Sequence, residues 1–476
     1  MARFPAPDPR RLLAAAFLAL VLPLGVVLAM VTPPGQVADE VGHIERATAL
    51  SEGHALGRRS VIVWPDGVTR PAAGVDADPA TAITTLGPPP NPRKLSAEEV
   101  ARAHQETWRH EDHFLEINPL AVYLPIFYLP SAAGVGVARL LGMSPFHAIT
   151  AGRLASLLAY GALGLTALLL ARRGRGLLFC TLAVPMAVSL GASVNQDGLL
   201  IAASALAAAL ASRGPGDGRA RLGAALLIGA VAVVKPPYLV LAAMLLLPLG
   251  DGWRALRRRI GLAALVALPA LAWTAYAMRT IAAPVPWPLY DAGPLWPGPP
   301  GTTFEIADAA AQLTVLAARP LRVLTLPLHT IATDPWLARE TVGVLGWLAI
   351  PLPGWLYTLW AVAVGCGLAA DGLGRPQGRP AWRWMDAALL LLAILLGVVL
   401  IYMSQYLVWT RVGAPRVEGP QGRYLLPLVP MLALAVPCVA PAGRPLRAAL
   451  CAPAVAAALG GLAVVPGLIV AAFYLR

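Results

Sequence analysis

Apolar runs long enough to cross a membrane recur along the chain, and they restrict its possible folds more than any other feature. The first, at 12–31, reads LLAAAFLALVLPLGVVLAMV. A helix of about 20 such residues covers the hydrocarbon core of a bilayer. Hydrophobic residues make up 58% of the 476 residues, above the share usual for soluble domains. We therefore predict an all-α polytopic membrane protein, with 1–476 forming a single integral membrane domain.

The basic residues predict how this domain is oriented. The formal net charge is +12. The arginines of the chain fall in short clusters between apolar runs, as in cytoplasmic loops. Six predicted cytoplasmic stretches hold eighteen arginines. Arg3, Arg10 and Arg11 place the N-terminus in the cytoplasm. The sequence lacks a basic helix with interleaved aromatic residues, so the charge does not predict nucleic-acid binding.

With these clusters inside, the apolar runs give about eleven transmembrane helices. We expect them at about 12–31, 147–171, 177–194, a run ending near 212, 222–234, 236–250, 260–279, 347–370, 386–408, 424–440 and 448–473.

Two extracytoplasmic segments follow from this topology. The first loop, 32–146, begins with a polar stretch to about 118 that holds thirteen of the 25 acidic residues. Residues 119–142 resemble another span, but a crossing there would put the arginines at 172–175 outside. Pro125 and Pro130 also interrupt a regular helix. We expect a juxtamembrane, non-crossing element there, and a second outer segment at 280–345.

Several charged residues lie at the outer ends of the predicted spans. They are Asp39, Glu40, Asp197, Lys235 and Arg423. Each taken alone can be a snorkelling or helix-capping residue. Their gathering on one side of the membrane also suits a shared site.

Two kinds of chemistry suit such a site. If the stretch after Pro33 and Pro34 is helical, Asp39 and His43 share a face, and a carboxylate beside an imidazole suits a general base. Lys235 and Arg423 are cations that could hold a phosphate. A lipid phosphate could then be the leaving group while a hydroxyl acceptor is deprotonated from the water side.

The histidine-rich stretch HQETWRHEDHFLE raises the question of a metal site. His104, His110 and His113 do not have the spacing of a zinc motif. We expect no metal there, and instead a solvated amphipathic helix that lies on the membrane.

Several sequence blocks, in order, resemble the domain-of-unknown-function 2142 family of bacterial multipass membrane proteins. The blocks are PPGQVADEVGHIERATALSEG, YLPIFYLPSAAGVGVARLLG, GRLASLLAYGAL, SVNQDGLLIAASAL, VKPPYLVLAAMLLLP, GVLGWLAIPLPGWLY and GPQGRYLLPLVPML. The resemblance spans nearly the whole chain and implies a location in the bacterial inner membrane.

The layout of that family is similar to that of the C-type (GT-C) glycosyltransferases, which use polyprenyl-phosphate sugars on the outer side of the membrane. The resemblance implies that Asp39 is the catalytic base, with Glu40 and His43 orienting it. Lys235 and Arg423 are then the cations for the carrier phosphate.

Asp197 and Arg153 are further candidates for substrate contact, although a helix cap and a packing role suit them equally. The partners implied are a polyprenyl-phosphate-linked sugar, an envelope acceptor and membrane lipid, with no cofactor. The sequence departs from the layout of the C-type glycosyltransferases in one respect, because we find no large C-terminal soluble domain after the last predicted span. A lipid-linked sugar transporter or flippase, or a non-catalytic membrane scaffold, are the alternatives.

Overall fold

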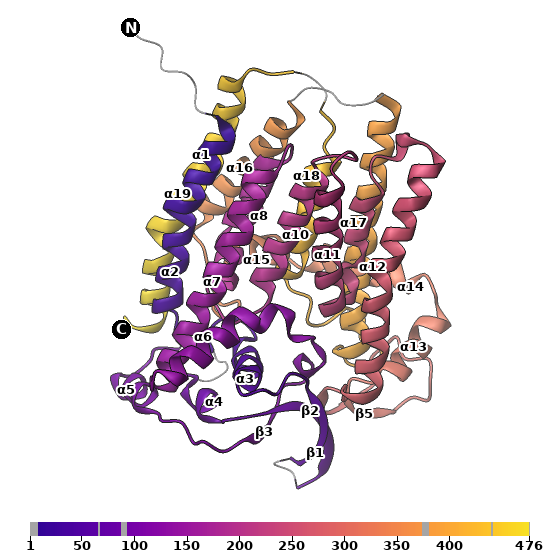
Figure 1. Ribbon diagram of the computed structural model, residues 1–476. Helices are drawn as coiled ribbons and strands as arrows, with labels where there is room; N and C mark the ends of the chain where they lie inside the picture. Colours follow the sequence, from indigo (N-terminus) through magenta and orange to yellow (C-terminus); the bar gives the residue numbers. More distant parts are fainter. Residues whose placement is uncertain (1–7, 65–66, 87–92, 374–379, 439–440, 476) are drawn as a thin grey trace.

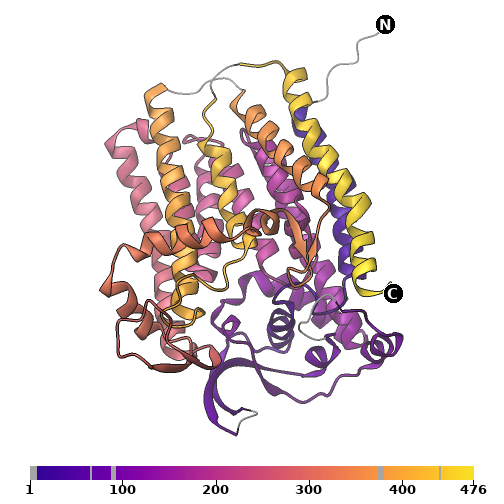
Figure 2. The same ribbon diagram turned by 180° about the vertical axis from the view of Figure 1, so that it is seen from behind.

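The structure is a computed structural model that describes residues 8–64, 67–86, 93–373, 380–438 and 441–475. Arg3, Arg375 and Arg379 of the predicted cytoplasmic clusters lie outside these ranges. The described chain is mostly helical. Long helices lie side by side in a bundle, and the outer segments cover one end of it (Figures 1 and 2).

The bundle is built by helices from the whole length of the chain. In order they are α1 (Pro9–Ala16), η1 (Phe17–Val21), α2 (Leu22–Val31), α7 (Pro145–Leu170), α8 (Arg175–Ala183), α9 (Pro185–Gly191), α10 (Asp197–Ala211), α11 (Gly218–Val234), η4 (Pro236–Leu246), η5 (Leu249–Asp251), α12 (Trp253–Thr280), α16 (Gly354–Gly372), α17 (Pro380–Val408), η6 (Gly422–Leu428), α18 (Val429–Ala435) and α19 (Arg444–Phe473).

Five helices within the described ranges are long and apolar enough to cross a membrane. They are Pro9–Val31, Pro145–Leu170, Trp253–Thr280, Arg383–Val408 and Arg444–Phe473. The other predicted spans also contain helices, but these are shorter or interrupted. The predicted run at 177–194, for example, is divided into α8 and α9 before Pro185, whose ring cannot continue a hydrogen-bonded helix.

Helix α10 lies in the centre of the bundle (Figure 1). Its sequence, DGLLIAASALAAALA, is apolar after the first residue except for Ser204, and residues 197–209 are buried. Small residues let neighbouring backbones approach closely. A Cβ added at Gly198 would lie 2.4 Å from the backbone nitrogen of Gly191, so α9 touches the start of α10 there.

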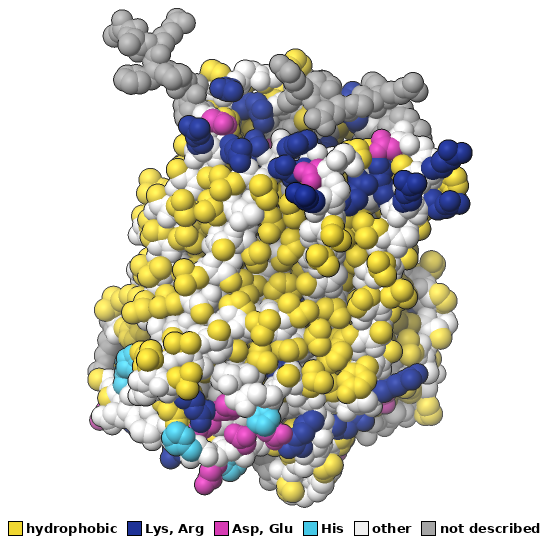
Figure 3. Space-filling model, in the orientation of Figure 1, with side chains coloured by type: hydrophobic (Ala, Val, Ile, Leu, Met, Phe, Trp, Pro, Cys, Tyr) yellow, Lys and Arg dark blue, Asp and Glu magenta, His cyan; other side chains and the backbone are white. Residues whose placement is uncertain are grey.

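Charge and apolar surface are separated along the bundle. Figure 3 shows an apolar belt between two polar ends. The end at which α1 and α19 begin is rich in arginine, and the opposite end carries acidic and histidine side chains together with further basic ones. This distribution is that of a membrane protein with two different aqueous sides.

The two segments predicted to lie outside, 32–146 and 280–345, and the residues just after them contain short strands that the prediction of an all-α fold did not include. The elements are α3 (Glu40–Ser51), β1 (Arg58–Val63), β2 (Thr69–Ala77), α4 (Ala80–Thr84), α5 (Ala97–Gln105), β3 (His113–Glu116), η2 (Leu120–Val122), η3 (Pro125–Tyr128), α6 (Leu129–Leu140), β4 (Pro286–Asp291), β5 (Thr303–Ile306), α13 (Ala309–Ala318), α14 (Arg322–Thr333), α15 (Leu337–Gly343), β6 (Val344–Leu345) and β7 (Ile350–Pro351).

The largest sheet corrects the prediction for the histidine-rich stretch. Strands β1, β2 and β3 pair antiparallel in that order, with Val75 opposite Leu115. Helix α5 ends at Gln105, so His110 and His113 are not on an amphipathic helix. The pairing of β3 with β2 supplies hydrogen-bond partners for the backbone N–H and C=O groups that a helix would otherwise pair internally. No local sequence pattern predicted this pairing.

Residues 119–142 form η2, η3 and α6. Helix α6 has 12 residues and is therefore about 18 Å long, too short for the hydrocarbon core. It packs closely against α7, and a Cβ added at Gly134 would lie 2.5 Å from the carbonyl oxygen of Ala151. This element lacks the length to cross a bilayer.

Candidate functional site

Asp39 occupies an unusual backbone position directly before α3. Its φ of 63° and ψ of 3° lie in the left-handed region, which few residues with a side chain adopt. The helix begins at Glu40, not at Pro33, because residues 33–39 form turns. The expected helix therefore carries His43 but not Asp39. Such strain persists only where neighbouring groups impose it, and it often marks a functional site.

Groups from two distant elements impose this conformation. The side-chain amide of Asn195 donates to the carbonyl of Ala38 at 3.1 Å, and Arg423 Nη1 donates to the same oxygen at 2.9 Å. Arg423 Nη2 also donates to Asp39 Oδ2. The Asp39 side chain remains 34% exposed, whereas that of Arg423 is 1% exposed. Asp39 is thus held firmly and stays reachable from outside.

Four of the predicted site residues form one connected charge cluster: Asp39, Asp197, Lys235 and Arg423. Lys235 Nζ donates to Asp197 Oδ1 at 2.5 Å. Arg423 Nε lies 3.5 Å from Asp197 Oδ2, so Asp197 links the two cations. The helix ends that carry these residues meet at one place, although only Lys235 of the four lines the cavity described below. Two carboxylates and two cations give the cluster a formal charge of zero.

Glu40 and Arg153 form a second, buried ion pair next to Asp39 in the chain. Arg153 donates to Glu40 through Nε at 2.8 Å and through Nη2 at 2.5 Å, and both side chains are almost fully buried. Arg153 also donates to the carbonyls of Thr32 and Pro33. The pair therefore ties the loop after α2 to α7.

His43 lies on the first turn of α3 and is also buried. Its Nδ1 is 2.6 Å from the hydroxyl of Tyr128. Burial lowers the pKa of His43 to about 4, against smaller opposing effects of Asp197 and Asp39. His43 is therefore neutral near pH 7. Within the described residues, the His43 backbone N–H donates to the Asp39 carbonyl at 3.4 Å, and the side-chain hydrogen bond of His43 goes to Tyr128 and not to Asp39.

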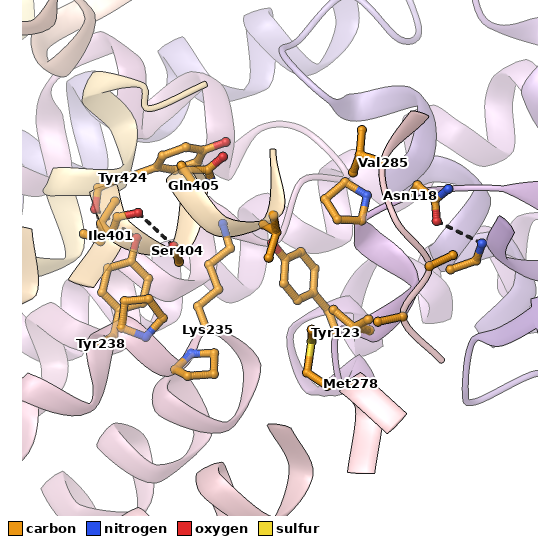
Figure 4. A pocket seen from close by; sticks show the side chains of 18 residues that line it. Asn118, Tyr123, Lys235, Tyr238, Met278, Val285, Ile401, Ser404, Gln405 and Tyr424 are labelled. Carbon is orange, nitrogen blue, oxygen red and sulfur yellow. Dashed lines mark hydrogen bonds between the residues drawn. The ribbon is translucent and has the colours of Figure 1, made fainter. Parts of the chain in front are cut away.

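Lys235 opens onto a cavity at the end of the bundle that residues 32–146 and 280–345 cover, which we call the Lys235 cavity. It holds about 960 Å³ of empty space, part of it open to the outside. Figure 4 shows Lys235 with Tyr123 on one side and Tyr424 on the other. The ammonium lies 5.5 Å and 5.0 Å from the centres of these two rings, a cation–π distance. Asp39, Asp197 and Arg423 do not line the cavity.

The remaining wall of the Lys235 cavity is mostly apolar. It includes Met278 of α12, Ile401 and Val408 of α17, and Val285. Met278 is 49% exposed, so the cavity reaches the side of the bundle at α12. A cavity with one cation among its described lining residues and a mostly apolar wall that reaches the surface at Met278 suits an amphiphilic anion.

Sequence reasoning missed several residues of this site. Tyr123, Tyr424, Asn195 and Gln405 contact the cluster or line the Lys235 cavity. Tyr424 follows Arg423, Asn195 lies two residues before Asp197, and Tyr123 lies in the segment 119–142. Aromatic and amide side chains are common at span ends, so these positions alone did not mark a site. Only the fold shows that these side chains meet. No group of three potential metal ligands gathers within the described residues.

Residues 22–432 match the model of the family described as "Predicted membrane protein (DUF2142)". The chain belongs to this family. The match confirms the resemblance seen in the sequence blocks, and it includes all four residues of the charge cluster. No curated protein and no solved structure matches the chain. The DUF2142 assignment thus identifies a membrane protein and specifies no reaction.

The DUF2142 region also includes the buried pair of Glu40 and Arg153 and the whole wall of the Lys235 cavity. It ends within α18, before α19 begins. The features described above therefore all belong to the part of the chain that the family model covers.

Proposed function

We propose that this protein is a membrane glycosyltransferase of the C-type fold. It moves a sugar from a polyprenyl-phosphate carrier to a cell-envelope acceptor on the extracytoplasmic side. The observation that carries the proposal is the Lys235 cavity, because it joins an apolar lateral wall to a cation that is paired with the cluster around Asp39.

The proposal includes a topology. The protein crosses the bacterial inner membrane eleven times, with the N-terminus in the cytoplasm. The arginine-rich end of the bundle is the cytoplasmic one, which agrees with the usual excess of basic residues in cytoplasmic loops. The first loop, 32–146, and the second segment, 280–345, then lie outside with the charge cluster.

The reaction assigns a role to each group. The Asp39 carboxylate lies outside the lining of the Lys235 cavity, is linked to Lys235 through Arg423 and Asp197, and is 34% exposed. In the proposed reaction it accepts the proton of the acceptor hydroxyl, whose oxygen attacks the anomeric carbon of the sugar. The bond from that carbon to the phosphate oxygen breaks, and its electron pair stays on the phosphate. Lys235 stabilises the charge that develops there. The prenyl chain leaves along the apolar wall toward α12.

Arg423 has a different role from the one that the sequence suggested. Its guanidinium is already engaged by Asp39, Ala38 and Asp197, and it does not line the Lys235 cavity. We assign it to positioning Asp39, and Lys235 alone to the carrier phosphate. Glu40, Arg153 and His43 support the loop that presents Asp39.

The test uses purified protein in lipid nanodiscs with radiolabelled polyprenyl-phosphate sugars and an envelope extract as acceptor. Release of free polyprenyl phosphate is measured. Asp39→Asn should reduce turnover by about 10²–10⁴-fold, the usual contribution of a general base. Asn tolerates the left-handed backbone, so the fold should persist.

The control is Glu111→Gln, which removes an exposed carboxylate of the same outer segment and should leave turnover unchanged. Wild-type turnover in Asp39→Asn contradicts the mechanism. Movement of the intact labelled lipid across a bilayer, without transfer and without dependence on Asp39, identifies a transporter instead.

A further inference from the structure

Lys235, the cation proposed to meet the carrier phosphate, already has a carboxylate partner. Asp197 Oδ1 accepts from Lys235 Nζ at 2.5 Å, and the side chains are 6% and 13% exposed. Lys235 lines the cavity, whereas Asp197 lies behind it. A phosphate that enters the cavity must therefore compete with Asp197 for the same ammonium.

Asp197 has a second cation on its other side. Its Oδ2 lies 3.5 Å from Arg423 Nε, and that Nε has no hydrogen-bond partner within the described chain. When an anion takes Lys235, Asp197 can keep a charged neighbour by turning toward Arg423. The release of Lys235 thus does not leave a buried carboxylate without compensation, which is the costly outcome.

The charge of the cluster affects how tightly the Lys235 cavity can hold a phosphate. The four-residue cluster is formally neutral, so an incoming phosphate meets one cation that a carboxylate partly neutralises. Transfer converts a carrier phosphodiester, with one negative charge, into a phosphomonoester that carries up to two. A site with a free cation would hold this product more tightly than the substrate and delay its release.

We infer that Asp197 is a built-in counter-ion that competes with the carrier phosphate for Lys235 and keeps the binding of polyprenyl phosphate weak enough for release. The inference rests on the proposed function, because it concerns the same cavity. Asp197 is then a residue that sets the affinity of the site for anions and does not itself contact the substrate.

The experiment measures the affinity of the full-length protein, in nanodiscs of zwitterionic lipid, for a radiolabelled polyprenyl monophosphate. Asp197→Asn should bind it at least about tenfold more tightly. The Asp197 carboxylate repels a neighbouring phosphate, and this repulsion is strong in a partly buried site, where the effective dielectric constant is lower than in water. Asp197→Glu keeps the charge and should bind as the wild type does. In turnover assays, Asp197→Asn should lower both KM and kcat.

Two further variants separate the possible failures. Lys235→Ala should lose most of the binding, and Glu111→Gln should leave it unchanged although it makes the same change in net charge. If Asp197→Asn does not fold, Asp197→Ser removes the same charge and replaces it in the test.

Asp197 is also the first residue of α10, where a carboxylate can stabilise the helix end. If that is its only role, the neutral variants unfold more easily without binding the phosphate more tightly, and this result overturns the inference. Loss of binding in Lys235→Ala with no gain in Asp197→Asn rejects the counter-ion and keeps the carrier site. Unchanged binding in Lys235→Ala rejects both.

Discussion

Removal of Arg153 is the sharpest test of how the loop that carries Asp39 is held. The guanidinium donates to both oxygens of Glu40 and to the carbonyls of Thr32 and Pro33. Arg153→Met keeps much of the apolar volume but leaves Glu40 as a buried carboxylate without its cation. Two backbone amides, of Gly35 and Val194, still donate to Glu40 and offset part of the loss.

The expected cost is large. Breaking a buried ion pair from one side typically costs about 3–5 kcal/mol, and we expect a loss of this size in the free energy of unfolding. Arg58→Ala is the matched control, because Arg58 also forms a two-pronged pair with a carboxylate, Asp76, but is 49% exposed. That exposed pair should contribute about 1 kcal/mol or less.

The assay is unfolding of the purified protein in mixed micelles with increasing SDS, followed by the fluorescence of its 13 tryptophans. A double variant, Glu40→Gln with Arg153→Met, should be more stable than Arg153→Met alone, because no unpaired charge remains. The reasoning is refuted if Arg153→Met unfolds at the same SDS fraction as Arg58→Ala.

Two further predictions concern stability. Burial, with a smaller contribution from Glu116, raises the pKa of Glu45 from 4.5 to about 8. Between these values the folded protein binds the extra proton, so its stability falls as pH rises through this window, by at most about 1.4 kcal/mol per pH unit. Glu45→Gln should therefore be more stable than the wild type at pH 8 and equal to it near pH 4.5; equal stability at both pH values would contradict this. Gly198→Ala should lower the free energy of unfolding by about 1–3 kcal/mol through overpacking against Gly191. Gly216→Ala is its control, because a Cβ there meets no atom within 4 Å, and equal effects of the two changes would argue against the close approach of α9 and α10.

The outer segments show where sequence reasoning was insufficient. In β1, Val61 and Val63 are 64% and 70% exposed, so apolar alternation does not mark a buried face in this strand. Its pairing with β2, and that of β2 with β3, joins segments separated by loops. The break at Val184 and the turn at residues 33–39 also depend on the elements that pack around them.

The sequence by itself determined that this is a helical membrane protein of the DUF2142 family, and that its ionisable residues gather at the ends of apolar runs. These are local properties, because hydrocarbon excludes charge wherever a run happens to lie in the fold. The tertiary structure decided which of those ends meet. Glu40 pairs with Arg153 across 113 positions, and Asp39 with Arg423 across 384. Hydropathy does not encode such pairings, because they depend on which helices pack together and on the backbone turn that directs Asp39 toward Arg423.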